Sequence, residues 1–284
     1  MRIPESCAQC LYSRQLKRMP DEAYLAEVRA LIDGRGENDT SPLLVYRFNQ
    51  AYARRFGLSG SYAQVKRRYN DLVLSMEDRI RARIEAADDP VAAALAFARV
   101  GNYIDYGAMD TVEEDTFLSL FDQAALREEE KEIYAHFLAA CERGKRFLLI
   151  ADNCGEIVLD KLLLEQVRRR FPGLTMQALV RGGEVLNDAT VQDAEYVGLG
   201  SAAEILSNGA AIAGTVYEMM PEPARQALDQ ADVILAKGQG NYESLSGQGR
   251  SIFFAFLCKC DLFIRRFGVP PLTGMLVEER GTAV

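Results

Sequence analysis

Apolar and polar positions follow two different patterns along the chain, and the change between them falls near residue 145. Before that point, apolar residues recur at the three- to four-residue spacing of an amphipathic helix. The N-terminal half is therefore expected to be helical. The predicted helices cover residues 21–33, 41–57, 61–87 (one long helix or two in series), 90–100 and 126–144.

From residue 145 onward, short apolar runs alternate with helical stretches. The predicted strands are "KRFLLIADN", "LTMQALVRGG", "AEYVGLGSAA" and "ADVILAKGQGN", and a helix over 156–170 follows the first. Strands that alternate with helices form βαβ units around a parallel sheet. The predicted fold is α/β, with a mostly parallel sheet and flanking helices in three Rossmann-like layers. An all-helical region, residues 1–144, is expected to pack on this core, residues 145–284.

Composition narrows the class of protein. Hydrophobic residues make up 49% of the chain and charged residues 26%, as in ordinary globular proteins. A formal net charge of −8 disfavours nucleic acid as the main partner. No apolar stretch approaches the roughly 20 residues that span a bilayer, and "MRIPESCAQC" lacks the apolar segment of a secretory signal. We therefore expect a cytoplasmic protein without membrane contact, whose cysteines are reduced.

Polar side chains follow three of the predicted strands. Because open α/β sheets bind ligands at the carboxyl ends of their strands, these residues predict a polar site at that edge. They are Asp152, Asn153, Gly155 and Glu156 after the first strand, Arg181 and Asp188 after the second, and Lys237, Gly238 and Asn241 after the last.

The residue types fit a hard divalent cation that works on a phosphate. Asp152 and Asp188 offer carboxylate oxygens and Asn153 an amide oxygen, which are the ligands such ions prefer. Lys237 would neutralise a phosphate held beside the metal, so we expect it to face the cation across that phosphate. Each residue alone also fits a structural role, such as an N-cap for Asp152. Glu156 and Asp160 would in that case be solvated acids of a first helical turn.

A further segment, "VGNYIDYGAMD" at residues 100–110, places Asn102 and Asp105 between helical stretches. Locally this is a turn in which polar side chains cap a helix end. If the helical region folds over the sheet edge, the same two residues would line the site.

The segments "GNYIDYG", "ADNCGEIVLDKLLLE", "VRGGEVLNDAT" and "AKGQGNYESL" occur in the order typical of one family. Over about residues 3–275 the sequence resembles the damage-control phosphatases, a former domain-of-unknown-function family. That family is also known by its protein-glutamate methyltransferase-like metal-binding domain. The N-terminal "CAQC" and the "KC" at Lys259-Cys260 resemble its prokaryotic branch.

The resemblance implies a metal-dependent hydrolase of small phosphate monoesters, such as damaged or surplus sugar phosphates or phosphopantetheine derivatives. The implied cofactor is a divalent ion (Mn, Ni, Co or Mg), and the partner is a small phosphorylated metabolite. By motif, the metal ligands are Asp152, Asn153 and Asp188. Asp152 or Asp105 is expected to accept the proton of the attacking water, and Lys237 to contact the phosphate. The expected substrate-binding residues are Asn102, Asp105, Gly155, Glu156, Arg181, Lys237, Gly238 and Asn241.

Cysteines and the single histidine are considered separately. Cys7, Cys10 and Cys260 either form a second metal or thiol cluster or are simply buried, and the resemblance favours grouping them. Burial is expected for Cys141 and Cys154, and a structural role for His136.

Two alternatives to the phosphatase stay open. A glycine-containing strand-to-helix turn also suits an S-adenosylmethionine-dependent carboxyl methyltransferase, although "GLGSAAEILSNG" is a poor dinucleotide fingerprint. A non-catalytic metal- or nucleotide-binding protein is the other. The sequence leaves the native metal, the substrate and the oligomeric state open.

Overall fold

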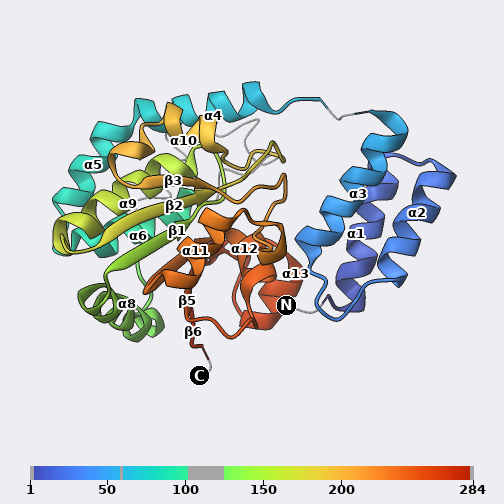
Figure 1. Cartoon of the computed structure of the whole chain (residues 1–284). Helices are drawn as coiled ribbons and strands as arrows, with labels where there is room; N and C mark the ends of the chain where they lie inside the picture. The colour runs from blue at the N-terminus through green and yellow to red at the C-terminus, as the bar shows by residue number, and fades with distance from the viewer. Residues whose placement is uncertain (1–2, 58–59, 102–124, 282–284) are drawn as a thin grey trace.

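The computed structural model describes residues 3–57, 60–101 and 125–281. Within these ranges a sheet of six strands forms the centre, helices cover both of its faces, and three N-terminal helices lie at one side (Figure 1). This arrangement confirms the predicted α/β fold with flanking helices and an N-terminal helical region.

The strand order β3-β2-β1-β4-β5-β6 contains one reversal, between β1 and β4. Neighbouring strands are parallel from β3 to β5, and β6 is antiparallel to β5. A reversal of this kind is the point at which open α/β sheets bind ligands. The strands are β1 (Arg146–Ile150), β2 (Thr175–Val180), β3 (Glu204–Ser207), β4 (Val233–Lys237), β5 (Ile252–Leu257) and β6 (Gly274–Glu279).

Each face of the sheet has its own apolar cluster, because successive side chains of a strand point to opposite faces. In β1, Phe147 and Leu149 join one cluster, whereas Leu148 and Ile150 join the other. The first cluster includes residues of α4 (Ala63–Ser75), α5 (Glu77–Glu85), α6 (Pro90–Gly101), α8 (Lys131–Arg143), α9 (Glu156–Arg170) and α10 (Val191–Tyr196). The second includes residues of α11 (Glu222–Gln230), α12 (Gly238–Leu245) and α13 (Asp261–Phe267). Short 3-10 helices are η1 (Glu128–Glu130), η2 (Leu199–Ser201) and η3 (Tyr217–Met219).

The N-terminal helices pack on one another around a separate apolar cluster that includes Tyr24 and Phe48. The second helix begins at Asp21, whose carboxylate accepts the Tyr24 N–H at 2.8 Å. The third begins at Thr40, whose hydroxyl accepts a backbone N–H in the same way. Such caps replace the intrahelical partners that a first turn lacks. These helices are α1 (Glu5–Arg18), α2 (Glu22–Asp33) and α3 (Ser41–Phe56).

Most of the predicted elements are present. The helices expected over 21–33, 41–57, 90–100 and 126–144 are α2, α3, α6 and α8, and the stretch 61–87 forms two helices in series, α4 and α5. The first, second and last predicted strands are β1, β2 and β4, and the helix over 156–170 is α9. The prediction does not include α1, the helices α10 to α13, or the strands β3, β5 and β6.

The strand predicted at "AEYVGLGSAA" is wrong, because this segment contains the end of α10 and the 3-10 helix η2. A capping box starts α10. The Asp193 carboxylate accepts the Thr190 backbone N–H at 2.9 Å and the Thr190 hydroxyl at 2.6 Å. Gly198 then leaves the helix with a φ of 73°. Capping chemistry therefore outweighs the short apolar alternation, and β3 begins only at Glu204.

The boundary predicted at residue 144 stays a prediction. The helices α4, α5, α6 and α8 share an apolar cluster with the sheet, whereas α1, α2 and α3 have a cluster of their own. Among the described helices, none combines the length and the apolar character needed to cross a membrane.

Candidate active site

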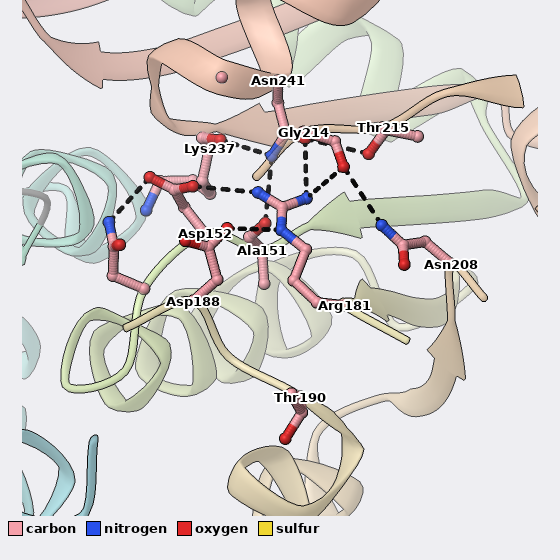
Figure 2. Close-up of polar contacts among 12 residues, drawn as sticks. Ala151, Asp152, Arg181, Asp188, Thr190, Asn208, Gly214, Thr215, Lys237 and Asn241 are labelled. Carbon is pink, nitrogen blue, oxygen red and sulfur yellow. Dashed lines mark hydrogen bonds and ion pairs between the residues drawn. The ribbon is translucent and has the colours of Figure 1, made fainter. Parts of the chain in front are cut away.

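The strand ends at the switch point bring the predicted polar residues together (Figure 2). Asp152 follows β1, Arg181 follows β2, and Lys237 is the last residue of β4. Figure 2 shows the carboxylates of Asp152 and Asp188 directed at the guanidinium of Arg181. Three crossover connections thus contribute to one polar site.

Arg181 holds the two carboxylates in place. Its Nη2 donates to Asp152 Oδ1 at 3.0 Å, and its Nε donates to Asp188 Oδ2 at 2.6 Å. Its Nη1 donates at 3.0 Å to both the Gly214 carbonyl and Asn241 Oδ1. The side chain is 1% exposed, so acceptors on all sides determine its orientation. Because Asp152 and Asp188 both contact one guanidinium, they lie close to each other.

Asn153 joins the same group through backbone and side chain. It forms an isolated β-bridge with Asp188, and its Nδ2 donates to Asp152 Oδ2 at 2.8 Å and to Glu156 Oε2 at 3.1 Å. The adjoining Cys154 N–H donates to the Asn187 carbonyl at 2.8 Å. Backbone hydrogen bonds therefore bind the β1–α9 turn to the β2–α10 loop, and all three predicted metal ligands share one place.

Electrostatics at this place favour a bound cation. Burial raises the pKa of Asp152, the negative charges of Asp188 and Glu156 add to the shift, and Arg181 and Lys259 oppose it, so that the pKa lies at about 8. Buried carboxylates that repel one another are stabilised by a divalent ion with hard oxygen ligands. Among the described residues, no group of three or more His, Cys, Asp and Glu side chains could hold a metal ion. The carboxylates of Asp152 and Asp188 and the amide oxygen of Asn153 are donors of the type that a hard divalent ion accepts, so the residues present fit such an ion.

Lys237 is directed away from this group, toward α9. Its Nζ donates to Glu156 Oε1 at 2.6 Å, to Asp160 Oδ1 at 2.7 Å and to the Ala98 carbonyl at 2.9 Å. An ammonium group has three hydrogens, and all three are used. Both acids and the lysine are 0% exposed. The structure thus places the lysine differently from the sequence prediction, because its ammonium neutralises two buried acids and has no hydrogen left for a phosphate.

Burial and neighbouring charges shift the pKa values of Asp160 and Lys237. Burial raises the pKa of Asp160, Lys237 opposes the shift and Glu156 adds to it, so that the pKa lies at about 7. Burial alone would lower the pKa of Lys237, but Asp160 and Glu156 together hold it above its usual value. Lys237 is therefore charged at neutral pH, and it keeps Glu156 beside Asn153.

Gly238 is placed where a side chain cannot fit. Its φ is 78°, and a Cβ at this position would lie 2.0 Å from Asp152 Oδ2. Gly247 has a similar φ of 81°, but nothing lies within 4 Å of its Cβ position. The two glycines therefore share the same backbone requirement, and only Gly238 also leaves room for a carboxylate of the site.

Gly238→Ala is expected to destabilise the protein more than Gly247→Ala. Gly247→Ala should cost about 1–2 kcal/mol for the left-handed backbone alone. In Gly238→Ala the new Cβ also displaces Asp152. We therefore expect a further decrease in the free energy of unfolding and at least a tenfold decrease in kcat/KM. Urea unfolding and kcat/KM of both variants check this. Equal effects of the two substitutions would show that the contact with Asp152 has no consequence.

Comparison with known proteins identifies the family. The sequence profile described as "Damage-control phosphatase ARMT1-like domain" matches residues 2–272. The chain belongs to the damage-control phosphatase family. It is 32% identical over 284 residues to a damage-control phosphatase of Archaeoglobus fulgidus, covering 95% of this chain and 96% of that protein. A damage-control phosphatase of Pyrococcus horikoshii is 30% identical over 218 residues, covering 75% and 73% of the two chains.

A solved structure agrees in fold. The crystal structure of a DUF89 family protein from Pyrococcus horikoshii superposes with a TM-score of 0.81 at 24% identity, and the match covers 99% of this chain and 100% of that one. At this identity the likeness shows the fold. The family itself supports a phosphatase role in metabolite repair.

The remaining predicted residues of the damage-control phosphatase site have mixed placements. Asn241 Nδ2 donates to the Ala151 carbonyl at 3.1 Å and to the Lys237 carbonyl at 2.7 Å, so it joins β1 to β4. Gly155, an expected substrate-binding residue, donates its backbone N–H to Asn70 Oδ1 at 2.6 Å. The predicted Asn102 and Asp105 lie outside the described residues.

Sequence reasoning missed two contributions to the site. Asp160 fitted a solvated acid of the first turn, yet it is fully buried beside Lys237. Glu156 and Asp160 are four positions apart, which places both on one face of α9, and that spacing was the available signal. Asn70 comes from α4, far along the chain, and no local pattern marks it.

The cysteine cluster stays a prediction. Cys7 Sγ lies 3.4 Å from Ser41 Oγ, and Gln239 Nε2 lies 3.6 Å from Cys260 Sγ. Burial raises the pKa of Cys7, Ser41 opposes the shift, and Glu243, Cys10 and Cys260 add to it. The three thiols are therefore close enough to interact electrostatically. All six cysteines are free thiols; Cys141 and Cys154 are buried, as expected.

Proposed function

We propose that the protein is a metal-dependent phosphatase that hydrolyses small phosphate monoesters, as a member of a metabolite-repair family. The observation that carries the proposal is the convergence of Asp152 and Asp188 on Arg181, with Asn153 bridged to Asp188. Family membership supplies the phosphatase class, and the oxygen-rich acidic site supplies the reason for a metal.

The proposed metal ligands are Asp152, Asn153 and Asp188. A divalent ion bound there would polarise the phosphate and activate the attacking water. Mn, Ni, Co and Mg all suit this ligand set, because hard oxygen ligands accept all four ions. The fully buried Glu156 accepts from both Asn153 and Lys237, so the lysine acts through Glu156 to position the amide of Asn153.

The chain's own groups provide the proton acceptor and the charge balance. Asp152 or Asp105 is the proposed acceptor, and Asp152 is the one within the described residues. Arg181 keeps Asp152 and Asp188 aligned and offsets part of their charge. The proposed substrate is a small phosphorylated metabolite in the cytoplasm.

Removal of metal should abolish the activity. After treatment with a strong chelator and gel filtration, the protein is expected to release less than about 1% of the parent amount of phosphate from para-nitrophenyl phosphate. Addition of Mn, Ni, Co or Mg one at a time should restore activity to different degrees. Full activity in chelated protein that metal analysis shows to be free of metal would contradict the proposal.

S-adenosylmethionine serves as the comparison ligand for the methyltransferase alternative. We expect no change in Tm when it is added to the metal-loaded protein. A concentration-dependent rise in Tm, together with no release of phosphate under any metal, would favour that alternative over the phosphatase.

A further inference from the structure

A cavity of about 700 Å³ lies between the N-terminal helices and the β2–α10 loop. One wall consists of residues of α1 and α3, including Arg14, Arg18 and Asn49, and the opposite wall includes Leu186. The volume lies within the range of small-molecule sites, roughly 300–1,000 Å³. The N-terminal helices therefore enclose a space large enough for a metabolite.

A single tight turn joins this cavity to the predicted metal site. Leu186 lies in the cavity wall, and Asp188 is two positions further along the chain. The Asp188 N–H donates to the Val185 carbonyl at 3.1 Å and closes the turn. The Leu186 and Asp188 Cα atoms can be separated by at most about 7 Å. The predicted metal site and the cavity therefore lie next to the same turn, with Asp188 on the buried side and Leu186 in the cavity wall.

Leu186 has two unusual features for a leucine. Its φ is 46°, in the left-handed region that non-glycine residues rarely adopt, and its side chain is 41% exposed. Left-handed backbone costs roughly 1–2 kcal/mol for a residue with a Cβ. Such conformations persist where the surroundings hold them, often at ligand sites. In this position Leu186 presents an apolar surface to whatever occupies the cavity.

The cavity is locally positive in a protein whose formal net charge is −8. Of its three arginines, Arg54 donates to Glu27 at 2.6 Å and is neutralised. Arg18 donates to the neutral Asn49 Oδ1 at 2.7 Å and lies over the Tyr52 ring at 3.9 Å, so it is oriented without losing its charge. The one acid in the lining, Glu184, accepts the Ser61 hydroxyl at 3.1 Å and the Tyr62 N–H.

Arg14 is a second exposed cation of this wall, beside Arg18. Within the described part of the chain, no hydrogen bond or ion pair of its guanidinium is present, although its charge acts on Glu243 of α12. A guanidinium offers a planar set of donors that matches carboxylate and phosphate. Arg14 and Arg18 together therefore form a cationic wall, and the opposite wall contains the apolar Leu186 and the hydrogen-bonded Glu184.

We infer that this cavity binds the far end of the substrate, and that the preferred substrates are phosphate monoesters carrying a second anionic group. The inference rests on the proposed function for the placement of the first phosphate. The scissile phosphate lies beside Asp188, the linking carbons pack on Leu186, and the second carboxylate or phosphate binds Arg14 and Arg18 on α1.

A matched set of substrates tests the inference. Alkanediol bisphosphates of increasing length are compared with monophosphates of the same length that end in a neutral hydroxyl. The measured quantity is the ratio of kcat/KM for the bisphosphate to that for the monophosphate, in the metal-loaded protein. We expect the ratio in the parent to exceed about ten at the preferred length, as for a charge-assisted contact. Binding of the non-hydrolysable bisphosphonate is measured by calorimetry in parallel.

Two variants of the same helix separate a specific contact from general charge. Arg14→Gln is expected to lower the ratio, and to weaken bisphosphonate binding, by roughly five- to tenfold, because exposed Arg14 is screened by water. Lys17→Gln removes the same charge from an exposed position of α1 outside the cavity lining, and should leave both unchanged.

A ratio near one in the parent, or equal values in the parent, Arg14→Gln and Lys17→Gln, would overturn the inference. Failure of the proposed function looks different, because the parent would then release no phosphate from either substrate type. If the parent protein has no phosphatase activity, the bisphosphonate titrations still decide whether Arg14 binds an anion. Equal affinities of Arg14→Gln and Lys17→Gln for the bisphosphonate would show that it does not.

Discussion

Asp188→Asn is expected to reduce the metal-dependent kcat/KM for para-nitrophenyl phosphate by more than about 100-fold. Replacing a residue that only supports a metal ligand already lowers metal affinity or activity roughly 10–100-fold. Asp188 is itself a proposed ligand, so a larger loss is expected. Asparagine keeps an oxygen that can accept the Arg181 Nε–H, which donates at 2.6 Å in the native protein. The variant should therefore fold, and its affinity for metal, measured by calorimetry, should fall together with activity.

Asp78→Asn is the matched control, because Asp78 is exposed on α5 and the substitution removes the same charge. Its activity and metal affinity should equal those of the parent. If Asp188→Asn folds, binds metal as tightly as the parent and hydrolyses the ester at the parent rate, the assignment of Asp188 is wrong, and with it the common site of Asp152, Asn153 and Asp188.

Lys237→Met is expected to destabilise the folded protein by about 3–5 kcal/mol. The substitution removes the ammonium that forms ion pairs with Glu156 and Asp160, and all three side chains are 0% exposed. A charge left buried without its partner loses hydration without gaining a compensating contact. Urea unfolding followed by circular dichroism measures the loss. Activity should also fall, because Glu156 would no longer be held beside Asn153.

Additional variants separate this role from the direct phosphate contact that the sequence suggested. Asp160→Asn in the Lys237→Met background removes one uncompensated acid and should recover at least about 1 kcal/mol. Lys131 forms an ion pair with Glu128, and its side chain is 65% exposed. Lys131→Met should therefore change the free energy of unfolding by less than about 0.5 kcal/mol. If Lys237→Met unfolds like the parent but has no activity, the lysine contacts substrate instead of positioning Glu156.

The predicted elements differ in how far local pattern determined them. Helix α9 follows directly from the apolar spacing after Gly155, and all its predicted bounds agree with the structure. The strand predicted over residues 194–203 rests on an apolar alternation that is short and ambiguous. The capping box of Thr190 with Asp193 is itself visible in the sequence, so a stricter reading of helix starts would have found α10.

The candidate site shows the same division. That Asp152, Asn153, Arg181 and Asp188 stand at strand ends follows from the sequence, because carboxyl ends of parallel strands share one edge. Their mutual arrangement does not follow. Arg181 could have faced the substrate, but its placement between two acids depends on acceptors from Gly214 and Asn241, which are 33 and 60 positions away.

The sequence by itself determined the α/β class, the order of the motifs and the edge of the sheet at which they gather. Hydrophobic periodicity and the succession of strands and helices along the chain can be read from neighbouring residues. Only the tertiary structure decided what each charged group faces. Lys237 meets Glu156 and Asp160 across 81 and 77 positions, and the Ala98 carbonyl across 139. The arginines of α1 and α3 meet the turn before Asp188 across a cavity. Burial and long-range partners set the charge and direction of these side chains, and neither is encoded in the spacing of neighbouring residues.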